Sequence, residues 1–435
     1  MENRAVQIKC RGLSSRIDHF LSSFQPPTSN FRFKLMIILG LFFSANGLSQ
    51  QLETYIQEAE QNNPEISAFE LRYELASEKV NEVNTLPDTE FSAGYFVSEP
   101  ETRTGAQKAR FSVRQMIPWF GTITARENYA ASMADAEYIE IAVAKRKLAL
   151  SVAQSYYRLY SLQERQEVLL ENIELLEVYH ELAINSLEVG SASAVDVLRL
   201  QMRQNELAQQ KQTLEQEFDA ERVNFNNLLN RREDMNVMVV DSMAIPQEEV
   251  LRDLSIAEVH PELLKFDRLY ESVAEAELLN QKEALPKLGF GIDYIPVAER
   301  TDMIVDESGK DILMPMVSVS IPIFNNKYKS VSRQNEIKQQ EIAAQRAERV
   351  NKLETLLAMA LNNRASAKIT ANTFLRNIEQ AKDAEEILVR SYETGTIDFN
   401  DVLDVQELQL KFQTGLIEAV KNYYQQTALV NYLTN

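Results

Sequence analysis

Residues 186–201 read SLEVGSASAVDVLRLQ, and residues 391–406 return the same pattern as SYETGTIDFNDVLDVQ. The two stretches share Ser, Glu, Gly, Asp, Val, Leu and Gln at matching positions. The correspondence continues on both sides in Asn63-Pro64-Glu65 and His260-Pro261-Glu262, Leu86-Pro87 and Leu285-Pro286, Ile117-Pro118-Trp119-Phe120 and Ile321-Pro322-Ile323-Phe324, and Asn226 to Asn230 and Asn431 to Asn435. Because the offset between partners runs only from 197 to 205, the sequence predicts two tandem structural repeats.

The N-terminus carries the pattern of a secretory signal peptide. A basic flank at Arg32 and Lys34 precedes the apolar run 35–43 and the small residues of 44–47. The run is shorter than the ~20 apolar residues of a membrane-spanning helix. We therefore expect residues 1–47 to be an N-terminal extension and signal peptide.

The rest of the chain is strongly acidic. Without residues 1–47 it has 39 basic and 62 acidic residues, a formal charge of −23, which argues against nucleic acid as a partner. The single cysteine, Cys10, falls in the leader. The exported chain is therefore expected to have neither a disulfide framework nor a thiolate metal site.

Two segments of each repeat alternate polar and apolar residues with a period of two, which is typical of half-buried strands. They are residues 88–97, 108–117, 287–296 and 314–323. One face of these segments is polar, and we expect its charged residues to face a water-filled lumen: Arg110, Arg114, Lys287 and Asp293. At about ten residues each, the segments also match membrane-spanning β-strands. Four strands cannot close a barrel and open edges are excluded from hydrocarbon, so several copies would have to combine their strands.

Long helices are predicted for most of the remainder. Residues 122–189 contain no proline or glycine, enough for roughly 100 Å of helix at ~1.5 Å per residue. Spacings of four and three describe a coiled-coil seam at Leu148, Val152, Ser155, Leu159, Leu162, Gln166, Leu169, Ile173 and Leu176. A second Gly- and Pro-free run covers residues 327–394, and shorter helices are predicted for 195–230 and 401–433.

The predicted fold class is mainly α with a small β part: a long coiled-coil helical barrel and four antiparallel membrane strands per chain. The first repeat would comprise residues 48–230 and the second residues 253–435. Each would contain a helix, two strands and a long helical hairpin. Residues 231–252, with Pro246 and mixed charge, are predicted to connect the repeats.

These landmarks, over residues ~50 to 435, resemble the TolC-type outer-membrane efflux protein family. The resemblance implies a homotrimer in the outer membrane, with a twelve-stranded β-barrel in the lipid and an α-helical barrel extending into the periplasm. It implies an exit duct of a tripartite efflux or secretion system, which passively conducts what an inner-membrane pump expels. The implied partners are a periplasmic adaptor (membrane fusion protein) and a pump of the RND, MFS or ABC type.

The resemblance also implies an iris-like gate at the periplasmic tip. Asp401 and Asp404 match a constricting ring of aspartates, and Tyr392 matches a tyrosine that holds the closed tip. The turns at the hairpin tips would include Gly190, Asp196 and Gly395. Ile397 stands where the prototype channel has an arginine, and Arg199 stands where Asp404 stands in the other repeat. The closing salt-bridge network of the prototype is therefore expected to be absent or replaced.

Simpler structural roles compete with several of these assignments. Asp401 and Asp196 could stabilise the first turns of their helices, and His260 is expected to cap a helix rather than bind a metal. Methionines commonly fill gaps, although thioethers can also bind copper; the candidates are Met303, Met314 and Met316. We therefore predict no metal site and no cofactor.

No arrangement of residues indicates an enzyme: the exported chain has two histidines, no cysteine, no nucleophile elbow and no phosphate loop. The alternative function is structural, namely an exported coiled-coil scaffold or adhesion protein without channel activity. In that case the alternating segments would form a soluble sheet with an exposed apolar face.

Overall fold

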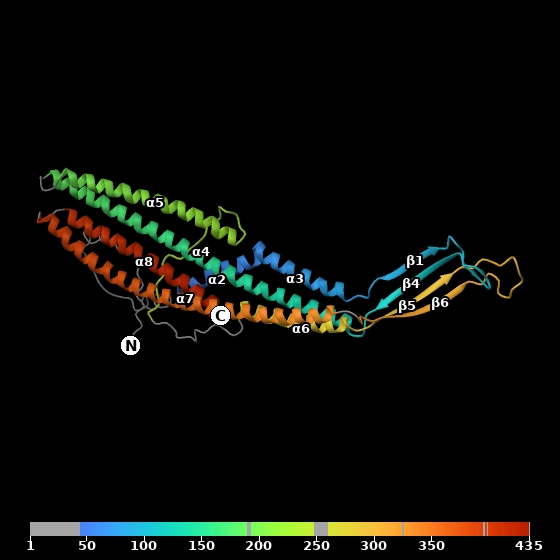
Figure 1. Cartoon of the computed structure of the whole chain (residues 1–435). Coiled ribbons are helices and arrows are strands. Elements are labelled where there is room, and N and C mark those ends of the chain that lie inside the picture. Colours follow the sequence, from blue (N-terminus) through green and yellow to red (C-terminus); the bar gives the residue numbers. More distant parts are fainter. Residues whose placement is uncertain are drawn as a thin grey trace, which may run out of the picture. The chain divides into compact units, whose positions relative to one another are not determined.

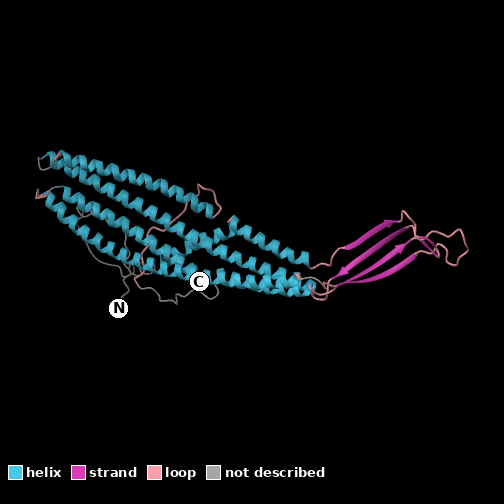
Figure 2. Cartoon of the chain, in the orientation of Figure 1, coloured by secondary structure: helices cyan, strands magenta, loops and turns pink. Residues whose placement is uncertain are grey.

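The computed structural model describes residues 44–188, 193–247, 260–323, 326–394, 396–397 and 399–434, without the side chains of 44–50. The predicted apolar run 35–43 lies outside these residues. The fold is mostly helical with a small antiparallel sheet, which confirms the predicted class (Figures 1 and 2). The elements are α2 (Ser44–Asn62), α3 (Pro64–Val83), β1 (Thr89–Tyr95), β2 (Glu101–Thr102), β3 (Gly105–Ala106), β4 (Ala109–Ile117), α4 (Thr122–Glu188), α5 (Ala194–Leu228), α6 (Pro261–Glu283), β5 (Lys287–Ile295), β6 (Ile312–Ser320), α7 (Lys327–Glu393) and α8 (Phe399–Thr434). Within the described ranges, none of the helices combines the length and the apolar character needed to span a membrane.

The chain divides into two compact units, and each takes segments from both halves of the sequence. The helical unit comprises the described parts of residues 1–67, 144–260 and 352–435. The sheet unit comprises residues 68–143 and the described parts of 261–351. The compact units therefore divide the chain differently from the two predicted repeats.

The sheet unit contains a four-stranded antiparallel sheet in the order β1-β4-β5-β6. The pairing of β4 with β5 joins the two halves of the sequence, with Ser112 opposite Asp293 and Val113 opposite Ile292. Between β1 and β4, residues 101–106 form the short hairpin β2–β3. Gly121, with φ of +79°, makes the turn from β4 into α4, a backbone conformation that glycine adopts without steric cost.

Four long helices run side by side in the helical unit in the order α5, α4, α8, α7 (Figure 1). Gln166 of α4 donates to the carbonyl oxygen of Leu214 on α5 at 3.2 Å. The rings of Phe374 on α7 and Phe412 on α8 lie 6.0 Å apart. The predicted seam on α4 is buried at Leu148, Val152, Ser155, Leu159, Leu162, Leu169 and Leu176. Burial of this apolar stripe is the main source of stability for such long helices.

Candidate functional site

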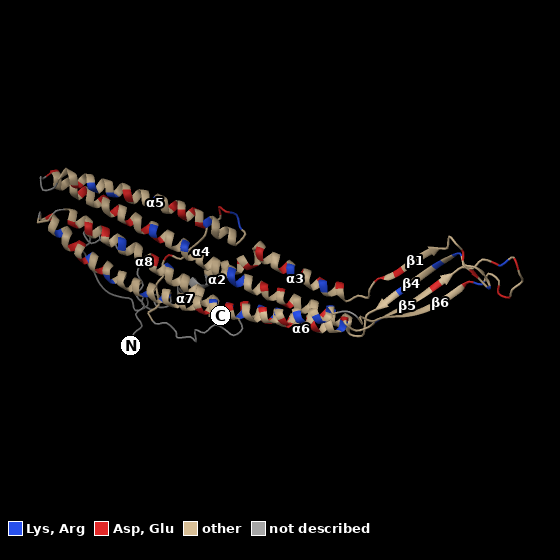
Figure 3. Ribbon diagram, in the orientation of Figure 1, with Lys and Arg blue, Asp and Glu red and all other residues tan. Residues whose placement is uncertain are grey.

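The polar face of the sheet brings the four predicted lumen residues together. Side chains alternate between faces along a strand, so the pairing of Ser112 with Asp293 puts Arg110 and Arg114 on the same face as Asp293 and Lys287. Arg110 forms an ion pair with Asp293, whose side chain is fully buried. Figure 3 shows blue and red bands on the strands of the sheet. The arrangement suits a wall that faces water.

The opposite face of the sheet is apolar and uncovered. Phe91 is 78% exposed and Val317 is 71% exposed, and the same face holds the exposed side chains of Phe111, Ile292 and Tyr294. Each edge strand, β1 and β6, has one partner strand within the described residues. A continuous exposed apolar face of this kind marks a surface that contacts lipid or protein.

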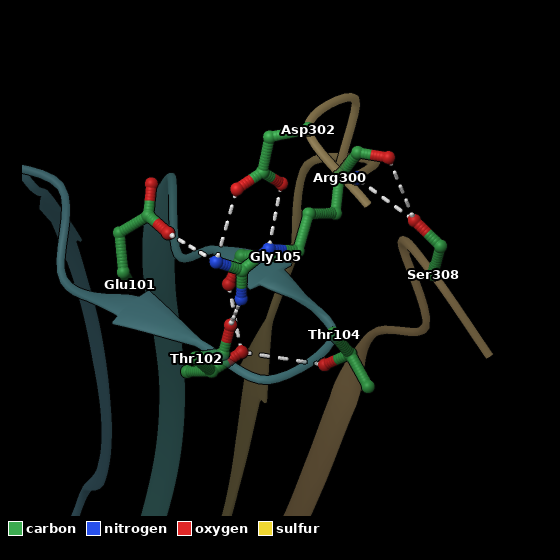
Figure 4. Close-up of polar contacts among 7 residues, drawn as sticks. All are labelled: Glu101, Thr102, Thr104, Gly105, Arg300, Asp302 and Ser308. Atoms are coloured by element: carbon green, nitrogen blue, oxygen red, sulfur yellow. Dashed lines mark hydrogen bonds and ion pairs between the residues drawn. The ribbon is translucent and has the colours of Figure 1, made fainter. Parts of the chain in front are cut away.

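Two loops at the outer end of the sheet are tied together through Arg300 (Figure 4). Its guanidinium donates to the Thr102 carbonyl oxygen at 3.0 Å and to Asp302 at 2.8 Å, and it lies 3.5 Å from Glu101. The hydrogen bond and charge of Arg300 lower the pKa of the Asp302 carboxyl. The hydroxyl of Ser308 accepts from the backbone N–H of Arg300 at 2.8 Å. Sequence reasoning missed this contact, because it joins loops about 200 residues apart and no local pattern encodes it.

A glycine allows the same two loops to approach closely. Gly105 has φ of +141°, and a Cβ added there would lie 1.8 Å from the Ala298 carbonyl oxygen. The backbone N–H of Gly309 donates to Thr104 O at 2.8 Å, and that of Ala298 to Ala106 O at 2.8 Å. The loops therefore form one hydrogen-bonded cap over the end of this sheet.

The predicted gate aspartates both lie on α8 with exposed side chains. Asp401 is in the first turn of the helix. Asp404 lines a groove of about 830 Å³ whose walls also include Arg165 of α4, Arg203 of α5 and Lys411 of α8. The lining also includes Glu206, Glu217 and Glu407, so Asp404 shares the groove with charges of both signs, and Asp401 is not part of that lining.

The other residues predicted at the hairpin tips are Asp196, which caps a helix, and the two glycines Gly190 and Gly395. Asp196 completes a capping box at the start of α5, accepting from the backbone N–H of Ser193 at 3.1 Å while Ser193 Oγ accepts from Val195 N at 3.1 Å. This contact bears out the structural role considered for Asp196. Gly190 and Gly395 lie outside the described residues.

Tyr392 is buried in an aromatic cluster near the tip. Its ring packs edge-on against Phe399 at 4.8 Å, and Phe399 packs against Tyr179 at 5.8 Å. The Tyr179 hydroxyl donates to Glu385 at 2.6 Å, whereas the buried Tyr392 hydroxyl has no hydrogen-bond partner in the described part of the chain. Periodicity alone could not find this cluster, because its rings come from α4, α7 and the first residue of α8.

A direct contact joins the two hairpins of the helical unit near their tips. The Arg199 guanidinium on α5 donates to Oδ1 of Asn400 on α8. Arg199 occupies the position that corresponds to Asp404 in the other hairpin. Arg199 therefore links α5 to α8, and the link joins the first hairpin to the second.

Two of the residues considered as metal ligands, His260 and Met316, contact other groups of the chain. His260 is buried, and its Nε2 lies 3.2 Å from the Tyr432 carbonyl oxygen, while Asn63, its counterpart, donates to Leu228 O at 2.8 Å. The sulfur of Met316 lies 4.0 Å from the Arg110 guanidinium, a position unfavourable for a bound cation. Met314 is on the same face of the sheet, and Met303 is in the outer loop. Across the described residues, no His, Cys, Asp and Glu side chains group in a way that could hold a metal ion.

Comparisons with known proteins agree with this architecture. Residues 55–231 match the family model described as outer membrane efflux protein. A search of the curated proteins finds no match for the sequence.

Several solved outer membrane proteins share the fold. The outer membrane protein VceC of Vibrio cholerae is 17% identical, with a TM-score of 0.69 over 88% of this chain and 96% of its own. The Campylobacter jejuni CmeC outer membrane channel is 14% identical, with a TM-score of 0.70 over 88% and 85% of the two chains. The open-state Neisseria gonorrhoeae MtrE outer membrane channel is 15% identical, with a TM-score of 0.69 over 88% of each.

The family match covers residues 55–231, and the shared fold extends over 88% of the chain. In sequence over that segment and in fold, the chain therefore resembles the TolC-type outer membrane efflux protein family, whose members are outer-membrane channels that extend into the periplasm and are not enzymes.

Proposed function

We propose that three copies of the chain combine their sheets into one twelve-stranded barrel, and that this trimer is the outer-membrane exit duct of a tripartite efflux or secretion system. The observation that carries the proposal is the open four-stranded sheet, with one charged face and one exposed apolar face. Unpaired edges in hydrocarbon cost several kcal/mol per polar group, which favours closure by further copies. The same exposed face counts against a soluble scaffold or adhesion protein.

In the closed barrel, the apolar face would contact lipid and the polar face would line the lumen. Arg110, Arg114, Lys287 and Asp293 would then face water. Substrates would pass through this lumen by diffusion, and the energy would come from an inner-membrane pump of the RND, MFS or ABC type acting through a periplasmic adaptor.

The periplasmic tip would act as an iris-like gate. Three copies of Asp401 and Asp404 around a narrow lumen would attract cations and repel anions, as charged rings do in channels. Two contacts would hold the hairpins of one copy together in the closed gate: the packing of the buried Tyr392 ring on Phe399, and the hydrogen bond from Arg199 to Asn400. Opening would require the hairpins of α7 and α8 to move apart at the tip after an adaptor docks.

Reconstitution of the purified protein in planar bilayers tests the proposal. We expect the wild-type protein to give discrete single-channel currents. The control variant Phe111→Asp with Ile292→Asp places charges on the apolar face, and at the same protein concentration it should insert poorly. The proposed duct would be contradicted by an oligomer that inserts fully into the bilayer but passes no ions, even when the gate residues Asp401, Asp404 and Tyr392 are substituted.

A further inference from the structure

A pocket of about 480 Å³ lies in the helical unit, with walls from α2, α4, α8 and the segment that follows α5. All of its lining residues belong to this one unit. Its volume falls within the about 300–1,000 Å³ of small-molecule sites, which are largely apolar and carry a few polar groups. None of its residues is among those assigned to the proposed lumen face or gate.

Tyrosine side chains form a continuous aromatic wall in this pocket. The ring of Tyr157 on α4 lies 5.8 Å from that of Tyr156 and 5.4 Å from that of Tyr424 on α8. Tyr156 is 2% exposed, and the other two are half-buried. Burial raises the pKa of all three hydroxyls, that of Tyr156 to about 12, so the wall stays uncharged at neutral pH. Such rings pack well against a flat aromatic molecule, at centroid distances of ~4.5–7 Å.

The lining as a whole carries no net charge. It contains one acidic residue, Glu53, and one basic residue, Arg146, and its other residues are uncharged. Thr427 and Asn431, one turn apart on α8, add a hydroxyl and an amide. A neutral and mostly apolar lining disfavours an ionic ligand, because a charge costs far more to remove from water than a neutral polar group does. A hydroxyl group on the ligand would instead find a hydrogen-bond partner in the amide of Asn431.

The same tyrosines hold the predicted connector between the repeats. The backbone N–H of Val240 donates to the Tyr156 hydroxyl at 3.2 Å, and the Tyr424 hydroxyl donates to the carbonyl oxygen of Ala244 at 2.6 Å. Met243, which lies between these two contacts in the sequence, lines the pocket. A molecule packed against the tyrosine wall would therefore restrict the side chains that anchor the connector.

We propose that this tyrosine pocket binds an uncharged aromatic molecule of the naphthol class, and that the bound molecule stabilises the attachment of the connector to α4 and α8. The two fused rings would pack against Tyr157 and Tyr424, and the hydroxyl would bond to Asn431. The apolar side chains of the pocket would cover the remaining ring surface, which supplies most of the binding free energy.

Calorimetric titration of the purified protein in detergent with 2-naphthol tests the site. We expect a single saturable site per chain above the uptake by detergent alone. Ala149→Phe extends a ring into the pocket from α4 and should weaken binding by about tenfold or more, since the ring takes the place of the probe. Ser151→Phe is the matched control, because Ser151 is exposed on the same helix and is not part of the lining. It should bind 2-naphthol as the wild type does.

A second variant and two further measurements keep the test decisive. Ala428→Phe fills the pocket from α8 and replaces Ala149→Phe if that variant fails to fold. Hydrogen exchange at the N–H of Val240 should slow when 2-naphthol is bound, which uptake by detergent would not cause. Photolabelling of the wild-type protein with 2-naphthyl azide should modify Tyr157 or Tyr424.

Three results would overturn the site: uptake of 2-naphthol that does not saturate, folded Phe variants that bind it as the wild type does, or labelling confined to residues outside the pocket. The charged analogue 2-naphthoate should bind more weakly than 2-naphthol. Equal affinity for the two probes would overturn the assignment to uncharged ligands. Unchanged exchange at Val240 in the saturated protein would overturn the effect on the connector.

Discussion

Glu164 shows how far the environment of a single side chain can alter its chemistry. It lies on α4 in the helical unit, is 5% exposed, and has a carboxyl oxygen without a hydrogen-bond partner in the described residues. Burial and, to a smaller extent, the charges of Glu167, Asp241 and Glu171 together raise its pKa to about 8. The raised pKa could not be predicted from the sequence, because glutamates are frequent on α4 and only tertiary packing distinguishes this one.

The raised pKa of Glu164 predicts how the stability of the helical unit changes with pH. The folded pKa exceeds the unfolded value, so the contribution of this group to stability is fully present below about pH 4.5 and is lost as pH rises through about 8. We expect Glu164→Gln to have little effect on the free energy of unfolding at pH 5 and to stabilise the protein by ~1–3 kcal/mol at pH 9. Chemical denaturation at the two pH values measures this.

Glu181→Gln is the matched control for Glu164, since Glu181 lies on the same helix, is exposed and is not among the charges that raise the Glu164 pKa. Its effect should be smaller and should not depend on pH in the same way. An equal response of the two variants would mean that Glu164 is ionised in the folded protein at neutral pH.

Asp401 and Asp404 carry a second prediction for single residues. If three copies of each line one constriction, Asp401→Ala with Asp404→Ala should weaken cation preference and block by multivalent cations on the periplasmic side. The trimer should remain folded, because exposed charges at a helix end contribute only ~0.3–1 kcal/mol each. Single-channel recording measures selectivity and block, and Asp196→Ala, which removes a cap in the other hairpin, is the control. If multivalent cations block the double variant as strongly as the wild-type protein, both aspartates act only at the helix end and do not line a constriction.

At the scale of elements, the two faces of the sheet predict different chemical access. Cysteines at Arg114 or Lys287 should react with charged, membrane-impermeant thiol reagents in the assembled protein. Cysteines at Phe111 or Ile292 should not react, because lipid would cover them. Labelling followed by mass spectrometry measures the difference. The reverse pattern would invert the assignment of lumen and lipid faces, since a shift of one residue exchanges the faces of a strand.

The elements themselves were predictable where the pattern is local. The helix predicted over residues 122–189 occurs as Thr122–Glu188, and the alternation of Arg110 with Phe111 falls on a strand that ends at Ile117. Periodicity reports which face is buried, and a long run without glycine or proline reports helix length. The contact of Arg300 with Thr102 and the packing of Tyr392 on Phe399 could not be predicted in this way. Both depend on the approach of segments that only the folded chain brings together.

At the scale of the whole molecule, the open sheet predicts an oligomer. Purified protein in detergent should give a native mass of three chains, and the trimer should resist dissociation by mild SDS treatment because closure removes all strand edges. Native mass spectrometry measures the stoichiometry. A folded monomer as the only species would contradict the proposed barrel. A closed oligomer with another number of copies would contradict the count of twelve strands.

The equal lengths of α4 and α7 constrain how this chain can change during evolution. Both helices have 67 residues, whereas the outer loops differ: the offset is 199 between Tyr95 and Tyr294 but 204 between Ile117 and Ile321. The two halves therefore differ in length between their strands and not within these two long helices. A deletion in one hairpin alone would shift Gln406 of α8 away from Asn172 of α4, to which it donates a hydrogen bond at 2.8 Å. These helices can therefore be shortened or lengthened only in matched steps, and steps of seven residues disturb their packing least.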